Sequence, residues 1–214
     1  MAEARAVLPK QGTVVVVNLL FCVIFAVMKR VLYILVAMLV LVACGKRQPL
    51  VQSTFFDGVS FGNNKQAVLN RLYSQGFVDA ASGEQDAHFD SIPDATGYIL
   101  LKILTPPDTA GFLFLGERWG DVQLQLDDKG LFSLTLHSTT LPQAEEAKRH
   151  ARLLATLKAQ GYDMEPTVVG QSLVEGEATS IMGYRYSDGS HVVQFHENTT
   201  PGGNSSISLT HSAL

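Results

Sequence analysis

The sequence predicts an α+β fold: an antiparallel sheet with two helices packed on one face, preceded by an apolar signal helix. Three observations lead to this prediction. Apolar and polar residues alternate in several short runs after residue 97, as in strands with one buried face. Two stretches with leucines at helical spacing each end at a Gly-aromatic pair. Near the start of the chain, an apolar run over residues 31–43 follows two cations.

Residues 28–43 have the layout of a secretory signal peptide. Two cations precede the apolar run, and the small Ala43 stands directly before Cys44. The run is shorter than the about 20 residues that a spanning helix needs, so a cleaved signal fits better than a retained transmembrane helix. The end of the run resembles a bacterial lipobox, Leu41-Val42-Ala43-Cys44.

The lipobox resemblance implies that cleavage follows Ala43 and that the Cys44 sulfur carries a diacylglyceryl group. Each buried CH₂ contributes about 0.8 kcal/mol, so two or three chains such as palmitate hold a protein on a bilayer. Gly45, not aspartate, follows the cysteine. In lipoproteins of enteric-type bacteria this favours delivery to the outer membrane, where the domain would face the periplasm.

Residues 1–27 fit this signal poorly. Residues 13–27 form a second apolar run, and Lys29 and Arg30 separate it from the first. A charge at the centre of a span costs about 2.5–3.5 kcal/mol, which argues against one long helix. We expect Met28 to be the true start and the upstream segment to be an artefact of start assignment. The alternative is a genuine N-terminal membrane helix.

Residues 44–214 would form the mature protein, which is long enough for one domain with a core. Its net charge is −7, from 12 Lys and Arg against 19 Asp and Glu. This acidity, without a basic stripe, argues against nucleic-acid binding. The cysteines are Cys22 and Cys44, so a disulfide or a thiolate metal site within the domain is excluded.

The predicted domain begins with a tether and a helix. Residues 44–54 are expected to be a polar tether that stands the domain, residues 55–214, off the membrane. The Phe55-Phe56 pair at its end is expected to staple the chain to the core, or else to dock a partner. Asn63 is the expected N-cap of the first helix, with Gln66 as its capping-box partner, and Gly76 ends that helix.

The middle of the chain predicts a hairpin. Residues 77–94 are polar and predict a loop with at most one short strand, and residues 97–104 predict a strand. Residues 122–126 and 132–136 alternate on either side of a turn that contains Asp127-Asp128, which we expect to be solvated and not to bind a cation. Trp119 is expected in the core, with a partner anchor as the alternative.

The second half repeats the order of a helix and then strands. Thr140-Leu141-Pro142-Gln143 predicts a capping box that opens the second helix, with Pro142 in its first turn, and Gly161 ends it. Asp188-Gly189 predicts a type I′ turn between two strands. The expected strands cover residues 167–174, 178–186, 191–196 and 206–210.

The ends of the two helices match, because residues 68–77 align with residues 153–162. We interpret this as two α-β-β-β units, about 55–140 and 141–214, that share one sheet. The alternative is that amphipathic helices commonly end this way. Such units on a lipobox tether resemble SmpA/OmlA (BamE)-type lipoproteins and β-lactamase-inhibitor-like domains, through Phe61-Gly62, Val68, Leu72 and Gly76-Phe77. This resemblance implies protein binding rather than catalysis, and it transfers no functional residue.

No catalytic motif stands out in the sequence, and no cofactor is implied. His191 and His211 are weak metal candidates, because their strands could pair, but without a third ligand we expect surface histidines. We therefore expect a non-enzymatic, lipid-anchored envelope protein that binds a protein or an envelope ligand. The alternatives are an envelope enzyme with a dispersed Asp/Glu/His site and an inner-membrane protein that retains its N-terminal helix.

Overall fold

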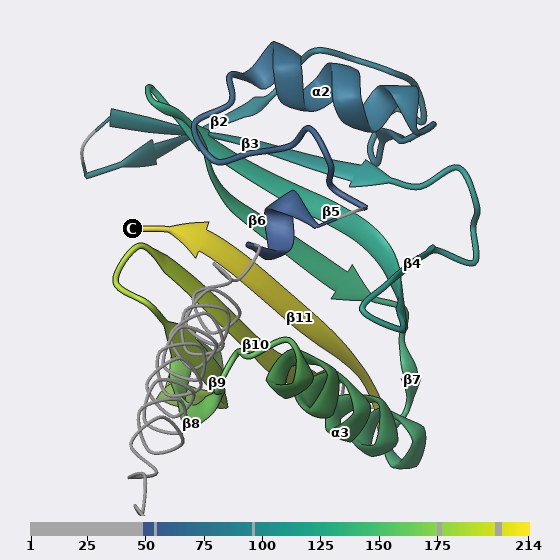
Figure 1. The fold of residues 1–214 in the computed structure, drawn as a ribbon, viewed down its shortest axis with the longest axis vertical. Coiled ribbons are helices and arrows are strands. Elements are labelled where there is room, and N and C mark those ends of the chain that lie inside the picture. Colours follow the sequence, from purple (N-terminus) through teal and green to yellow (C-terminus); the bar gives the residue numbers. More distant parts are fainter. Residues whose placement is uncertain (1–48, 54, 96, 175–176, 200–202) are drawn as a thin grey trace, which may run out of the picture. The chain divides into compact units, whose positions relative to one another are not determined.

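The computed structural model describes residues 49–53, 55–95, 97–174, 177–199 and 203–214, which belong to one compact unit (Figure 1). In chain order the elements are η1 (Leu50–Gln52), α2 (Lys65–Ser74), β1 (Val78–Asp79), β2 (Asp90–Asp94), β3 (Gly97–Thr105), β4 (Phe112–Phe114), β5 (Glu117–Asp127), β6 (Gly130–Ser138), β7 (Leu141–Pro142), α3 (Gln143–Ala159), β8 (Glu165–Val174), β9 (Glu177–Ser187), β10 (His191–Thr199) and β11 (Asn204–Ala213). The predicted mixed α+β class with an antiparallel sheet is confirmed.

The strands form one antiparallel sheet in the order β1-β3-β5-β6-β11-β10-β9-β8. Three short strands lie off this path, where β2 pairs with β3, β4 with β5 and β7 with β11. The two halves of the chain meet where β6 pairs with β11, from Ser133 opposite Ser212 to His137 opposite Ser208. Helix α2 contacts β6, and helix α3 contacts β11. The centre of the sheet is therefore built by residues far apart in the sequence.

The alternating leucines of β5 and β6 are buried, as predicted. Trp119 is also in the core, where its Nε1 donates a hydrogen bond to the Phe114 carbonyl oxygen at 2.8 Å. Phe55 stacks on Phe112 with 4.7 Å between ring centroids, next to the buried Phe56. The predicted core tryptophan and aromatic staple are therefore confirmed.

Both helices begin later than the sequence predicted. Asn64, not Asn63, caps α2, because its side chain accepts a hydrogen bond from the Ala67 N–H at 3.0 Å. Asn63 instead accepts a hydrogen bond from the Ser60 N–H. The predicted cap of α3 at Thr140 is wrong. The next two residues form β7, which pairs with β11, so the helix starts only at Gln143.

Several strands and one turn also differ from the prediction. Residues 77–94, expected to hold at most one strand, contain β1 and β2. Pro93 is tolerated in β2, which pairs with β3 on one side. The turn between β9 and β10 is centred on Gly189 and Ser190, because the Asp188 N–H bonds to the His191 carbonyl oxygen. Gly189 has φ of +85° at the first central position, which is typical of type II′ and not of the predicted type I′.

The predicted tether is partly folded into the domain. Leu50 and Val51 of η1 are buried in the core. The Val51 N–H donates a hydrogen bond to Nδ1 of the buried His211 on β11, at 3.2 Å. The predicted tether over residues 49–53 is therefore wrong, and its residues 44–48 lie outside the described residues.

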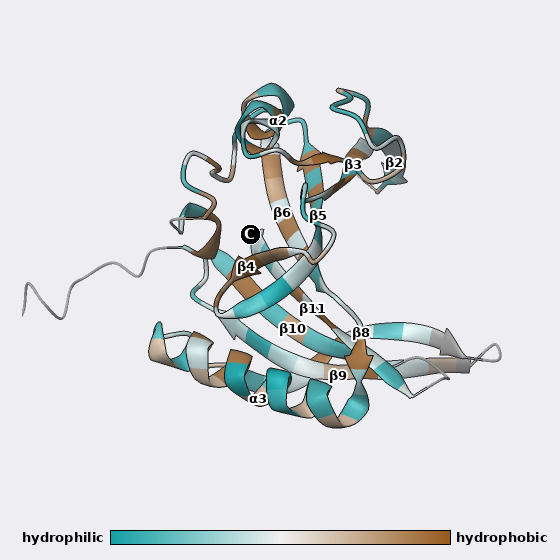
Figure 2. Cartoon of the chain, turned by 90° about the vertical axis from the view of Figure 1, so that its right-hand side faces the viewer, coloured by the Kyte–Doolittle hydropathy of each residue, from teal (hydrophilic) through white to brown (hydrophobic). Residues whose placement is uncertain are grey.

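Strand β9 has two neighbouring strands along only part of its length. It pairs with β10 only from Tyr184 to Ser187, and from Glu177 to Gly183 it pairs with β8 alone. Figure 2 shows this β8–β9 hairpin projecting beyond the neighbouring strands. Gly183 lies at the point of change, where a Cβ atom would be only 2.4 Å from the Phe195 carbonyl oxygen. Only glycine allows so close an approach of two backbones.

Candidate functional site

The face of the central sheet that points away from the leucine core is polar. Opposed residues in an antiparallel sheet point to the same face, so the register places one continuous set of polar side chains on β5, β6, β11 and β10. This set, here called the polar face, consists of Asp121, Gln123, Gln125, Ser133, Thr135, His137, Gln194, His196, Asn198, Ser208, Thr210 and Ser212. The sequence predicted a wet face for the β5–β6 hairpin, but not its continuation across β11 and β10.

Side-chain hydrogen bonds join the polar face where the two halves of the chain meet. The hydroxyls of Ser133 and Ser212 are 2.9 Å apart, and those of Thr135 and Thr210 are 3.0 Å apart. The next pair in register follows the same pattern, with His137 Nδ1 3.1 Å from the Ser208 hydroxyl. Three successive cross-strand pairs are therefore bonded, which fixes the rotamers of groups that a ligand could meet.

The last of these pairs belongs to a row of four residues that crosses four strands. Asp121 lies opposite His137, His137 opposite Ser208, and Ser208 opposite His196. His137 Nε2 is 3.9 Å from Asp121 Oδ1, an oxygen that is buried and has no hydrogen-bond partner. Burial raises the pKa of Asp121, although the charge of His137 acts to lower it. Burial lowers the pKa of His196. We call these four residues the Asp-His-Ser-His row.

The row has the residue types of a catalytic triad, but its surroundings do not favour catalysis. Asn198 donates a hydrogen bond to the Ser208 hydroxyl oxygen at 2.9 Å, which occupies the atom that would attack a substrate. In addition, β6 and β11 each pair with a strand on both sides, so their backbone N–H groups serve the sheet. An oxyanion intermediate needs free donors of that kind.

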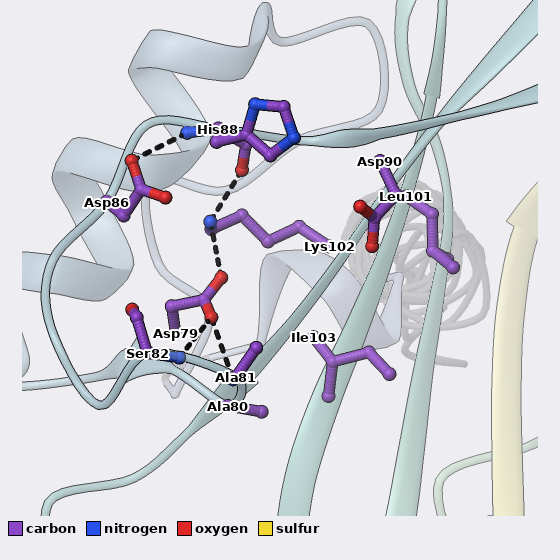
Figure 3. Close-up of a pocket in the computed structure, with 10 residues that line it drawn as sticks. All are labelled: Asp79, Ala80, Ala81, Ser82, Asp86, His88, Asp90, Leu101, Lys102 and Ile103. Carbon is purple, nitrogen blue, oxygen red and sulfur yellow. Dashed lines mark hydrogen bonds and ion pairs between the residues drawn. The ribbon is translucent and has the colours of Figure 1, made fainter.

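A second candidate site is an open cavity of about 320 Å³ beside β3 (Figure 3). Lys102 is buried in its wall, and its Nζ donates hydrogen bonds to Asp79 Oδ2 at 2.5 Å and to the His88 carbonyl oxygen at 2.6 Å. The hydrogen bond from Lys102 lowers the pKa of Asp79 to about 2. The ammonium group of Lys102 is thus already bound by groups of the protein. Its role is to hold the 80–89 loop against the sheet and not to bind a ligand.

The predicted metal candidates do not form a metal site. His191 lies opposite Ala213, and His211 lies opposite Val193, so the two histidines are diagonal neighbours with ring centroids 5.4 Å apart. Nδ1 of His211 already accepts the hydrogen bond from Val51, and His211 is buried instead of lying at the surface. Among the described residues, no group of three or more His, Cys, Asp or Glu could hold a metal ion.

Sequence reasoning missed a buried acidic residue under α3. Glu146 is fully buried, and neither of its carboxylate oxygens has a hydrogen-bond partner. Its nearest cation is Arg149 at 3.4 Å, one helical turn further on. Burial raises the pKa of Glu146 to about 7, against the opposing effect of Arg149. The sequence does indicate this burial, because helical spacing places Glu146 and Arg149 on the same side of the helix as the apolar Leu153 and Leu157.

The predicted lipidation residues, Ala43 and Cys44, lie outside the described residues, as does the whole predicted signal peptide. Within the part of the chain that the structure describes, no helix has both the length and the apolar character needed to cross a membrane. Comparisons with protein-family models, with curated proteins and with solved structures found no match for this chain.

Proposed function

We propose that this chain is a lipid-anchored lipoprotein of the bacterial cell envelope that is not an enzyme and binds a protein or an envelope ligand. The lipobox-like end of the apolar run supports the anchor, at Cys44. The observation that carries the binding role is the polar face, with its three bonded cross-strand pairs between β6 and β11. We place the domain at the outer membrane, facing the periplasm, on the basis of Gly45.

The polar face suits recognition by hydrogen bonds. Its hydroxyl, amide and imidazole groups recur at the strand spacing of about 4.8 Å, which matches polar groups repeated along an extended ligand. Because their rotamers are fixed by mutual hydrogen bonds, little side-chain freedom is lost on binding. A polypeptide or another envelope ligand rich in amides and hydroxyls is the occupant that this chemistry favours.

The finer fold hypothesis fits the same role. We propose that the domain consists of two related units, each a helix followed by antiparallel strands, whose helices pack on one face of the shared sheet. The unit has more strands than the predicted α-β-β-β order, because four strands, β8 to β11, follow α3. The last strands of the two units, β6 and β11, pair antiparallel, as a two-fold relation between units would require. The polar face then lies across the junction of the units, opposite the helices.

A mass measurement tests the anchor. The protein is isolated from envelopes, and the mass of its mature N-terminal peptide is measured. We expect a peptide that begins at Cys44 and carries acyl chains. An unmodified Cys44 contradicts the anchor, and a peptide that begins upstream of residue 28 favours the inner-membrane alternative.

For the binding role, ligands are captured from detergent-solubilised envelopes by the wild-type protein and by two variants. Thr210→Arg places a long cation on the polar face, whereas Asp128→Arg places the same side chain in an exposed turn. We expect Thr210→Arg to lose the captured species and Asp128→Arg to keep it. Equal capture by both variants contradicts the assignment of the polar face.

The Asp-His-Ser-His row favours a second candidate function, an envelope hydrolase with Ser208 as nucleophile. In that role His137 would accept the hydroxyl proton of Ser208, and Asp121 would orient the imidazole. Labelling with a fluorophosphonate probe distinguishes the candidates, with Ser208→Ala as the control. A binding protein should not be labelled, and labelling that Ser208→Ala abolishes would favour the hydrolase.

A further inference from the structure

The hairpin formed by β4 and β5 has an unusual turn. Phe114 pairs with Glu117, so Leu115 and Gly116 are the two central residues. Their φ angles are +55° and +77°, as in a type I′ turn, where Asn-Gly is the usual sequence. Leu115 is the one non-glycine residue with positive φ among the described residues. A leucine is thus held in a conformation that disfavours it, and its half-buried side chain packs against the core beside the surface of the hairpin.

This turn is surrounded by exposed apolar surface. Leu113 on β4 is 63% exposed. It lines a shallow cavity of about 290 Å³ together with Phe55, Leu115 and four other residues, Ser53, Phe114, Gly116 and Gln160. Figure 2 shows β4 as hydrophobic along its length. The cavity is therefore an apolar depression at the surface, and leucines from the tip of the hairpin form its rim.

One wall of this depression comes from the first residues of the described domain. Ser53, in its wall, directly follows η1, which is packed into the core through Leu50 and Val51. Pro49 is five positions after Cys44, a reach of at most about 18 Å when fully extended. A chain this short holds the residues around η1 close to any bilayer in which Cys44 is anchored.

The charges on the hairpin also suit a bilayer surface. Arg118 lies opposite Leu113 and is exposed. The carboxylate of Glu117 is buried and bound by Arg152 at 2.7 and 3.0 Å. The hairpin therefore presents Leu113 and a cation to solvent, beside the half-buried Leu115, although residues 44–214 as a whole carry a net negative charge. Apolar side chains beside a cation are typical of segments that lie in the interface of a membrane.

We infer that the tip of the β4–β5 hairpin is a membrane-contact patch, in which the exposed Leu113 enters the interface of the bilayer that holds the anchor and the half-buried Leu115 supports it from the hairpin turn. This inference rests on the proposed lipid anchor at Cys44. The patch would fix the orientation of the domain, so that the polar face is presented at a constant height and angle close to the membrane.

The test places an environment-sensitive fluorophore, NBD, on single cysteines of the full-length protein as the cell processes it. Leu113→Cys probes the patch, and Met182→Cys on β9 is the matched control, because Met182 is 62% exposed. The lipidated protein is reconstituted into phosphatidylethanolamine and phosphatidylglycerol vesicles that contain a bilayer-located quencher. We expect blue-shifted emission at position 113, with quenching several-fold stronger than at position 182.

The outcomes separate the two proposals. A mass measurement of the N-terminal peptide comes first, and an unmodified Cys44 overturns both the anchor and the patch. A lipidated protein whose label at position 113 is quenched no more than at 182 overturns the patch alone. Blue-shifted but unquenched emission at 113 would mean that protein covers the hairpin, and it too overturns the patch. Hydrogen exchange of the unlabelled protein checks the result, since β4 should exchange more slowly on vesicles than in detergent.

Discussion

The two faces of strands β6 and β11 are buried for different reasons. On one face, Leu134, Leu136, Ile207 and Leu209 pack into the hydrophobic core. On the other face, Ser133, Thr135 and Ser208 are also buried, yet their polar atoms bond to one another across the strands. The first face provides stability by removing apolar surface from water. The second contributes little net energy but holds polar groups in place, which is what a binding surface needs.

Buried polar groups outside the polar face have fewer hydrogen bonds. The hydroxyls of the polar face have partners, whereas the oxygens of Glu146, on α3, are buried without a hydrogen bond. His211 lies on the core side of β11, where its Nδ1 accepts a hydrogen bond from the Val51 N–H of η1.

The largest expected effect comes from the core face. Leu136→Ala removes a buried side chain from the centre of the core. We expect the free energy of unfolding to fall by about 2–5 kcal/mol, measured by urea denaturation. Ile103→Ala, at an exposed position on β3, is the control and should change the free energy by less than about 0.5 kcal/mol. Equal losses in both variants would contradict the division into two faces.

The next effect is the acid sensitivity of His211. Burial, reinforced by His191, lowers its pKa to about 3, against an ordinary value of 6.5. The unfolded chain takes up this proton more readily than the folded protein. The contribution of His211 to stability is therefore complete above pH 6.5 and is lost as the pH falls towards 3. One pKa unit corresponds to about 1.4 kcal/mol, so the loss amounts to several kcal/mol.

His211→Asn should reduce this slope, since its side-chain oxygen can still accept the hydrogen bond from Val51 but does not titrate. The measurement is the urea midpoint at several pH values between 3 and 7. If the variant and the wild type lose stability in parallel, His211 is not the source of the acid sensitivity.

Glu146 should produce a dependence of opposite sign. Its pKa in the folded protein is about 7, against an ordinary value of 4.5, mainly because of burial. The folded state therefore binds this proton more readily, so the contribution is complete below pH 4.5 and is lost as the pH rises through 7. Glu146→Gln should be more stable than the wild type above pH 7, by up to about 3 kcal/mol, and nearly equal to it at pH 4.5. Thermal unfolding at pH 4.5 and pH 8 measures this difference, which should not be found for Glu145→Gln at the exposed neighbouring position.

The smallest effect concerns the polar face itself. Thr135→Val and Thr210→Val each remove one hydroxyl of a bonded pair and leave the other without its partner. Each single change should cost about 1 kcal/mol, and the double variant should cost less than the sum of the two. A double-mutant cycle by urea unfolding measures the coupling, and strict additivity would mean that the pair is not joined.

Local patterns in the sequence predicted the local structure well. The alternating leucines of residues 122–126 and 132–136 predicted the β5–β6 hairpin, and Asp188-Gly189 marked the region of the β9–β10 turn. The predictions failed where a distant segment overrides local preference. Thr140 resembles a helix cap, but pairing of the next two residues with β11 delays the helix.

The candidate sites depended even more on distant contacts. The polar face requires β6 to pair with β11, which brings together residues 71–79 positions apart, and no local pattern encodes that pairing. The histidines at 191 and 211 could be placed on neighbouring strands, but not in register, because the length of the β10–β11 turn sets the register. Leu115 was not singled out, since a leucine is not a turn residue by preference.

The contact at Gly183 has a consequence for the shape of the sheet. There the backbone of β9 lies against that of β10 so closely that even alanine would strike the Phe195 carbonyl. The absence of one methyl group thus sets the direction in which a two-stranded arm leaves the body of the protein. A chain with any side chain at this position would have to carry that arm at another angle, and the reach of the domain would change with it.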